Sequence, residues 1–157
     1  MLHLEVPGLR TLYLHHLVLD VNGTLALDGE LLPGVRERLH RLRQQLTVHL
    51  VTADTHGRQE QIDRLLGLTA VRLVPGQPEA EQKAAFIRAL GDEGVVAIGN
   101  GANDTLMFRK ATLAIAVLGT EGLAVVALRE ADVLVPDIMT ALDLLLHPRR
   151  LIATLRR

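Results

Sequence analysis

The chain lacks cysteine and tryptophan entirely, and only three of its 157 residues are tyrosine or phenylalanine. Without cysteine it has no disulfides, no thiolate metal sites and no cysteine nucleophile. Long hydrophobic runs are also missing, because no apolar stretch reaches the roughly 18 residues of a transmembrane helix, and no basic-then-apolar signal segment opens the sequence. These absences predict a soluble protein of the cytoplasm that does not enter a membrane.

An excess of charge of either sign is absent as well. The 17 lysines and arginines nearly balance the 18 aspartates and glutamates, which gives a formal net charge of −1. Such a chain creates no overall field that would attract nucleic acid or an anionic membrane surface, so we expect neither as a partner. Lysine itself is scarce, since Lys83 and Lys110 are the only two. Lys83 is therefore a functional candidate, with an ordinary surface lysine as the simpler alternative.

The sequence is instead rich in short apolar runs that alternate with amphipathic stretches, with no repeat and no linker. We expect strands at residues 17–20, 47–52, 71–74, 95–98, 113–117 and 133–135, and helices at 35–46, 57–66, 79–90, 105–110, 121–129 and 137–146. This order predicts one domain over residues 1–157, a Rossmann-like α/β/α sandwich around a central parallel sheet. Residues 1–15 are expected to form an edge hairpin, residues 25–31 a tight hairpin, and residues 147–157 a basic, solvated tail.

Three of the predicted strands end in polar residues. Asp20, Asn22 and Thr24 follow the first strand, Thr52 and Asp54 end the second, and residues 100–104 follow the strand at 95–98. Because ligands of α/β sheets bind at the carboxyl ends of the strands, these groups are well placed to form one site. Asp20 alone would fit a strand followed by an Asx turn equally well. The ordered set favours a functional site.

Taken in order, four segments resemble the motifs of the haloacid dehalogenase superfamily of phosphoryl-transfer enzymes. They are Asp-Val-Asn-Gly-Thr at 20–24, Val-Thr-Ala-Asp at 51–54, Lys83, and Gly-Asn-Gly-Ala-Asn-Asp at 99–104. The resemblance covers residues 16 to about 138. Within the superfamily the chain most resembles small soluble proteins related to the phosphorylation domain of P-type ATPases, through residues 52–54, 99–104 and 114–117. The intervals between the motifs are already filled by the sheet's own elements, so we expect no cap domain.

The resemblance implies a role for each motif residue. Asp20 would be the nucleophile that forms an aspartyl phosphate, and Mg²⁺ would be the cofactor. The implied catalytic residues are Asp20, Asn22, Thr52 and Lys83. The implied phosphate-binding residues are Asp20, Thr52, Ala53, Lys83 and Asn103. The implied metal ligands are Asp20, the main-chain carbonyl of Asn22, Asn100 and Asp104.

Two positions depart from the family pattern. Asn22 replaces an aspartate that acts as general acid and base, and Asn100 replaces an aspartate that usually binds the metal directly. An amide exchanges no proton, and its neutral oxygen is a weaker ligand for a hard cation, so Asp104 would carry more of the metal's charge. The resulting hypothesis is a slow Mg²⁺-dependent phosphohydrolase that acts on a small phosphorylated substrate or nucleotide.

Two other readings of the sequence remain open. The first alternative is a non-catalytic module that binds phosphate or a nucleotide, which the two amides favour. The second is a purely structural interaction protein, which would not explain the three polar strand ends and Lys83 together. For the enzyme we expect a homo-oligomer, a dimer or tetramer, because capless relatives either act on large substrates or close the site with a neighbouring subunit. The apolar hairpin at 25–31 is the element expected to make that contact.

Overall fold

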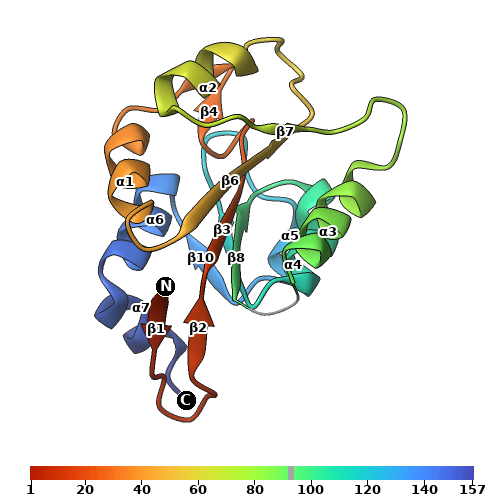
Figure 1. The fold of residues 1–157 in the computed structure, drawn as a ribbon. Helices are drawn as coiled ribbons and strands as arrows, with labels where there is room; N and C mark the ends of the chain where they lie inside the picture. Colours follow the sequence, from red (N-terminus) through yellow and green to blue (C-terminus); the bar gives the residue numbers. More distant parts are fainter. Residues whose placement is uncertain (92–93) are drawn as a thin grey trace.

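A computed structural model describes residues 1–91 and 94–157 of the chain. Its centre is a six-stranded sheet in the order β10-β9-β8-β3-β6-β7, in which every neighbouring pair is parallel (Figure 1). The strands are β3 (His16–Asp20), β6 (Thr47–Thr52), β7 (Val71–Arg72), β8 (Val95–Gly99), β9 (Leu113–Val117) and β10 (Val133–Val135). This confirms the predicted parallel sheet and places β3 in its middle, between β6 and β8.

Helices cover both faces of the sheet, which completes the three-layer sandwich (Figure 1). One layer contains α1 (Val35–Leu42), α2 (Gln59–Leu66), α6 (Ile138–Leu146) and α7 (Pro148–Leu155). The other contains α3 (Glu79–Leu90), α4 (Thr105–Lys110) and α5 (Val125–Leu128), with the short 3₁₀ helix η1 (Ala102–Asp104) ahead of α4. The amphipathic pattern explains this docking: α1, for example, buries Val35, Leu39 and Leu42 on one face.

The two faces of the sheet differ in the size of their side chains. Toward α1 and α6, strands β8 and β9 present Val96, Ile98, Leu113 and Ile115. Toward α3 and α4, the same strands present Ala97, Ala114 and Ala116 among their buried residues. Small side chains let a helix backbone approach the sheet closely, so the α3 layer can bring its residues close to the strand ends.

Two hairpins lie outside the main sheet. Strands β1 (Leu2–Leu4) and β2 (Leu12–Leu14) pair with each other as a separate antiparallel sheet. The sequence predicted a hairpin here. The hairpin forms a sheet of its own, and its Leu4 and Leu14 are fully buried in the hydrophobic core. The second hairpin joins β4 (Ala26–Leu27) to β5 (Glu30–Leu31) through Asp28 and Gly29, both at positive φ, as predicted.

Three further details differ from the sequence expectations. The basic tail is more ordered than expected: residues 148–155 form α7, whose Leu151 is completely buried, while its arginines are exposed. The helix predicted at 121–129 is only the four residues of α5, and residues 118–124 form a loop in which Gly119 and Gly122 adopt positive φ. The hairpin at 25–31 buries Leu25 and Ala26 in the domain's own core, so it offers little apolar surface to a partner.

The segments between the motifs contain no added domain in the part of the chain that the structure describes. Between β3 and β6 lie only the β4–β5 hairpin and α1, and between β6 and α3 lie only α2 and β7. This agrees with the expected capless architecture. Among the described helices, none is both long enough and apolar enough to cross a bilayer.

Candidate active site

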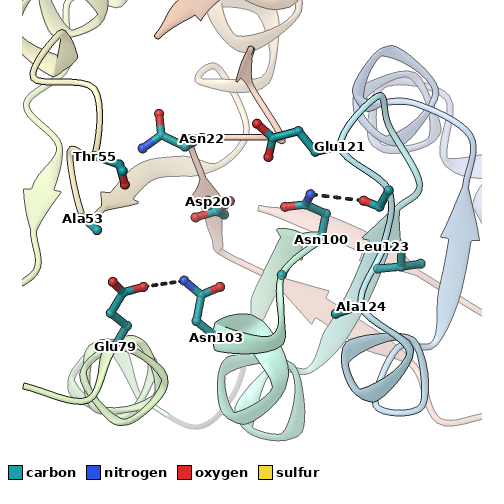
Figure 2. Close-up of a pocket in the computed structure, with 12 residues that line it drawn as sticks. Asp20, Asn22, Ala53, Thr55, Glu79, Asn100, Asn103, Glu121, Leu123 and Ala124 are labelled. Carbon is teal, nitrogen blue, oxygen red and sulfur yellow. Dashed lines mark hydrogen bonds between the residues drawn. The ribbon is translucent and has the colours of Figure 1, made fainter. Parts of the chain in front are cut away.

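A cavity of about 590 Å³ opens at the carboxyl edge of the sheet, where the sequence placed the site (Figure 2). Five predicted residues line it: Asp20, Asn22, Ala53, Asn100 and Asn103. The remaining lining residues are Thr55, Glu79, Gly101, Glu121, Gly122, Leu123 and Ala124. Thr52, Lys83 and Asp104 are buried behind this lining. All the predicted residues therefore belong to one site, in two layers.

Lys83 connects the two carboxylates of the site. Its Nζ lies 2.7 Å from Oδ1 of Asp20 and 2.7 Å from Oδ1 of Asp104. Helix α3 carries the side chain inward, where it is only 1% exposed. A surface lysine would not be paired in this way, so the simpler alternative for Lys83 is wrong.

Two buried carboxylates share this one ammonium group. Burial and the nearby charge of Asp104 raise the pKa of Asp20 from 3.8 to about 7, despite the opposing effect of Lys83. Burial alone would lower the pKa of Lys83, but the two carboxylates raise it above its ordinary value. Lys83 therefore stays charged, and when Asp20 ionises the cluster has one negative charge without a partner. A further cation near Asp20 would be stabilised there.

Asp104 supports the loop that follows β8. Its Oδ2 accepts hydrogen bonds from the main-chain N–H groups of Asn100, at 3.0 Å, and Gly101, at 2.9 Å. Its other oxygen contacts Lys83, and the residue is completely buried. A Cβ on Gly99 would lie 2.3 Å from Asp104 Oδ2, so the contact needs glycine at that position. Asp104 does not line the cavity, unlike Asp20 and Asn100, and it is fully buried behind Lys83. Its role as a metal ligand therefore stays a prediction, whereas its contacts with Lys83 and the loop are structural.

Thr24 brings the side chains of Asp20 and Asn100 together. Its Oγ1 lies 3.2 Å from Oδ2 of Asp20 and 3.2 Å from Oδ1 of Asn100, and donates its one proton to one of them at a time. The side-chain oxygens of Asp20, at the end of β3, and of Asn100, directly after β8, thus converge at the cavity. The first motif contained this threonine, but the sequence argument gave it no role.

The oxygens at this point are of the kind that Mg²⁺ prefers. Asp20 offers a carboxylate, and Asn100 and the main chain of Asn22 offer carbonyl oxygens, without sulfur or imidazole. Within residues 1–91 and 94–157 no three carboxylate, histidine or cysteine side chains are grouped to hold a metal. The donor set therefore fits a hard divalent cation, with fewer charged ligands than a strong site would have.

A second group of contacts surrounds Thr52 at the end of β6. Its Oγ1 accepts hydrogen bonds from Nδ2 of Asn22, at 3.3 Å, and from the main-chain N–H of Asp54, at 2.9 Å. Asp54 adopts a left-handed φ of 52° and accepts a bond from the N–H of Gln59 at the start of α2. Thr52 therefore orients Asn22 and the turn that contains Ala53. Its hydroxyl proton remains available to an acceptor.

Sequence reasoning missed two acidic residues that line the cavity. Glu79 was expected only as the first residue of the helix at 79–90, but its Oε2 accepts a hydrogen bond of 2.6 Å from Asn103 Nδ2 (Figure 2). Glu121 was interpreted as part of a helix, yet it lies in the loop after β9. Gly119 and Gly122 on either side of it were the signal that could have predicted a loop.

Comparisons with known proteins identify the family of the chain. A family model described as haloacid dehalogenase-like hydrolase matches residues 1–112. A protein of Methanocaldococcus jannaschii, "Uncharacterized protein MJ0073", is 48% identical over 62 residues, which are 40% of this chain and 67% of that protein.

Solved structures share the fold. A phospho-aspartyl intermediate analogue of phosphoserine phosphatase matches with a TM-score of 0.63 and 19% identity, over 83% of this chain and 98% of that one. A zinc-transporting PIB-type ATPase in the E2.Pi state matches with a TM-score of 0.60 and 23% identity, over 78% of this chain and 20% of that one. The family model spans most of the chain and includes the Asp20, Thr52, Lys83 and Asp104 segments that resembled the motifs. The chain therefore belongs to the haloacid dehalogenase-like hydrolases.

Proposed function

We propose that this hydrolase is a Mg²⁺-dependent phosphohydrolase in which Asp20 forms an aspartyl phosphate. The position of Asp20 is the observation that carries the proposal: it ends the central strand, faces the cavity, and is held by Lys83 at 2.7 Å and Thr24 at 3.2 Å. Phosphoryl transfer needs an aligned nucleophile and positive charge around the phosphoryl oxygens. Bound Mg²⁺ would supply part of that charge as a Lewis acid.

The residues of the chain suggest the following sequence of bonds. A carboxylate oxygen of Asp20 bonds to phosphorus while the bond from phosphorus to the leaving oxygen breaks. Asn22 has no proton to give, so the leaving group departs as an anion. Water then attacks the aspartyl phosphate, releases inorganic phosphate, and loses its proton to solvent because no base stands at Asn22. Acyl phosphates, anhydrides and aryl phosphates suit this site, since their leaving groups are stable as anions.

The metal ligands in this proposal differ from the sequence prediction at one position. Asp20, the main-chain carbonyl of Asn22 and the side-chain oxygen of Asn100 would hold Mg²⁺. Asp104 instead holds Lys83 and the loop at 100–101. Removing Asp104 would therefore misplace Lys83 and the Asn100 carbonyl together.

The first experiment is hydrolysis of an aryl phosphate with and without Mg²⁺. We expect measurable turnover that requires Mg²⁺ and is lost in Asp20→Asn, which keeps the shape of the side chain and removes the nucleophile. Lys110→Met is a matched control, because Lys110 is exposed and lies outside the cavity. Turnover that survives in Asp20→Asn would contradict the proposed nucleophile.

The second experiment examines the missing base at Asn22. Without a base, breakdown of the aspartyl phosphate is slow, so the phosphoenzyme should accumulate and be visible as an increase in intact protein mass after mixing with acetyl phosphate and Mg²⁺. Asn22→Asp should raise turnover by roughly 10- to 1,000-fold, within the range of general base catalysis, and remove the intermediate. No phosphorylated species together with no gain in the variant would speak against this order of steps.

The amides at Asn22 and Asn100 also favour a second candidate, a module that binds phosphate or a nucleotide without turning it over. Asn22 Nδ2 donates a hydrogen bond to Thr52. This contact would position Asn22 equally well in a site that only binds a ligand and in a site that turns it over. Saturable binding of a nucleotide by calorimetry, with no hydrolysis of acetyl phosphate or an aryl phosphate, would select this candidate.

The homo-oligomer, a dimer or tetramer, remains a prediction, as does a cytoplasmic location. Because the 25–31 hairpin buries Leu25 and Ala26, we propose a different surface for the subunit contact. Exposed Leu118, Val125 and Val126 instead flank the cavity loop. A neighbouring subunit on these residues would narrow the cavity. Light scattering that gives the mass of a monomer at high concentration would contradict the prediction.

A further inference from the structure

Glu121 is the lining carboxylate whose role the site described above leaves unexplained. It lies in the loop of residues 118–124, between β9 and α5, and its side chain is exposed at the cavity. Asp20 and Asp104 are paired with Lys83, and Glu79 accepts a bond from Asn103. Within the described residues, no hydrogen bond or ion pair engages the Glu121 carboxylate. A charged group held at a cavity without a partner is available to a ligand.

The loop that carries Glu121 is fixed to the site through Asn100. The side-chain Nδ2 of Asn100 donates to the carbonyl of Gly122 at 3.2 Å, and the main-chain N–H of Ala124 donates to the carbonyl of Asn100 at 2.9 Å. At its start, the loop is tied to the end of β10, where Leu118 N–H donates to Val135 O at 2.9 Å. Glu121 is therefore held in place from both ends of the loop.

Gly23 shows how closely Glu121 approaches the Asp20 loop. A Cβ on Gly23 would lie 2.1 Å from Oε2 of Glu121 and 3.0 Å from Nδ2 of Asn100. Both side chains thus converge on one point of the loop that also carries Asp20. Figure 2 shows the Glu121 carboxylate between Asn22 and Asn100, on the same side of the cavity. Gly23 also has a φ of 77°, a left-handed conformation that glycine adopts more readily than other residues.

The charges around the cavity explain why a carboxylate at this point matters. Asp20 and Asp104 contribute two negative charges and Lys83 one positive charge, which leaves one negative charge for a cation. Asn22 and Asn100, the neighbours of Asp20 at the cavity, are neutral. A divalent cation held by these groups alone would lack half of its compensating charge. Two further carboxylates line the cavity: Glu79 is engaged by Asn103, whereas Glu121 lies beside Asn100 and Gly23 and can supply the missing charge.

We propose that Glu121 provides the second carboxylate of the divalent-cation site, in the charge role that Asn100 cannot fill. This inference rests on the proposed Mg²⁺ dependence of the enzyme. It assigns a function to the loop at 118–124. It also explains how a site with two amides can hold a hard cation. In this proposal the loop after β9 supplies the carboxylate in place of the loop after β8. The two loops are joined by the Asn100–Gly122 hydrogen bond.

The test measures Mg²⁺ binding directly, by isothermal calorimetry and by the rise in melting temperature with Mg²⁺, in the absence of substrate. Glu121→Gln should weaken Mg²⁺ binding by about 10- to 100-fold, the usual effect of losing a residue that supports a bound metal. Glu79→Gln is the matched control, since it removes the same charge from another lining residue and should change the affinity by less than about threefold.

A double variant tests the charge argument itself. Asn100→Asp in the Glu121→Gln background moves the carboxylate back to the loop after β8, and should restore the affinity to within about threefold of the parent. Failure of this variant to recover binding, or an unchanged affinity in Glu121→Gln, would overturn the proposal while leaving Mg²⁺-dependent turnover of the parent intact. A parent that binds no Mg²⁺ at millimolar concentration would overturn the proposed function as well.

Discussion

Asp20→Asn should make the folded protein more stable while it abolishes the chemistry. The side chain is buried, and Asp20 and Asp104 share the single ammonium of Lys83, with both contacts at 2.7 Å. An asparagine keeps an oxygen that can accept from Lys83 and removes the second negative charge. Lys83 and Asp104 then form a neutral pair, which costs less to bury than three charges.

The pKa of Asp20 sets the size of this effect. Its rise from 3.8 to about 7 corresponds to a cost on the order of 4 kcal/mol for ionising Asp20 in the folded state, at about 1.4 kcal/mol per pKa unit. The new amide must find partners for its own N–H groups, which reduces the gain. We therefore expect the free energy of unfolding to rise by about 1–3 kcal/mol in Asp20→Asn at pH 8.

The pH dependence identifies the cause. Between pH 4 and pH 7 the unfolded chain has already lost the Asp20 proton, whereas the folded chain still holds it, so the folded parent loses stability as the pH rises. The Asp20→Asn variant has no carboxyl group at this position, so its stability does not change with pH for this reason. The stability difference between variant and parent should therefore be small near pH 4, grow up to about pH 7, and remain constant above it.

Urea unfolding followed by circular dichroism, at pH 4.5, 6 and 8 without divalent cations, provides the measurement. Saturating Mg²⁺ at pH 8 should reduce the difference, because a cation bound only to the folded parent stabilises it by mass action. An Asp20→Asn variant that is less stable than the parent at pH 8, or a difference that does not change with pH, would refute the reasoning.

Three further predictions concern single side chains. Asn100→Asp should tighten Mg²⁺ binding roughly tenfold, about 1.4 kcal/mol, by adding a charged oxygen; calorimetry showing an unchanged affinity would mean that this side chain does not reach the metal. Lys83→Met should destabilise the fold by about 3–5 kcal/mol, because it leaves Asp20 and Asp104 buried without their cation, and unfolding in urea will measure this loss. Leu151→Ala should cost about 2–5 kcal/mol, since it opens a cavity beneath α7; a cost near zero in the same assay would indicate that α7 is not part of the core.

Much of this fold follows from local sequence patterns. The apolar runs at 17–20, 95–98 and 113–117 are strands buried on both faces. The polar residues that follow the strands at 17–20, 47–52 and 95–98 meet at one edge because parallel strands share a direction. The start and end of α3 match the prediction because a proline precedes it and a glycine follows it. Such signals are short-range and survive in almost any tertiary context.

The pairings within the site could not be predicted in the same way. Asp104 was assigned to a metal, but whether its oxygens face the cavity or Lys83 depends on how closely α3 packs against β8. Glu121 was placed at the start of a helix at 121–129, whereas it lies in a loop. The hydrogen bonds between Asn100 and this loop join residues more than twenty positions apart. Local periodicity contains no information about such contacts.

The two faces of the sheet carry side chains of different size, so substitutions on the two faces should affect the enzyme differently. Ala97, Ala114 and Ala116 share a buried cluster with residues of α3 and α4, so we expect their size to limit how closely this layer, and Lys83 within it, approaches the sheet. Adding one or two methyl groups at Ala114 would move that layer outward and separate Lys83 from Asp20 without touching either residue. Loss of a methyl group from Ile115 on the opposite face would weaken packing yet leave that distance alone. Substitutions in adjacent residues of β9 should therefore have two different effects. Those at Ala114 should impair catalysis while the protein stays folded, and those at Ile115 should lower stability while the folded protein remains active.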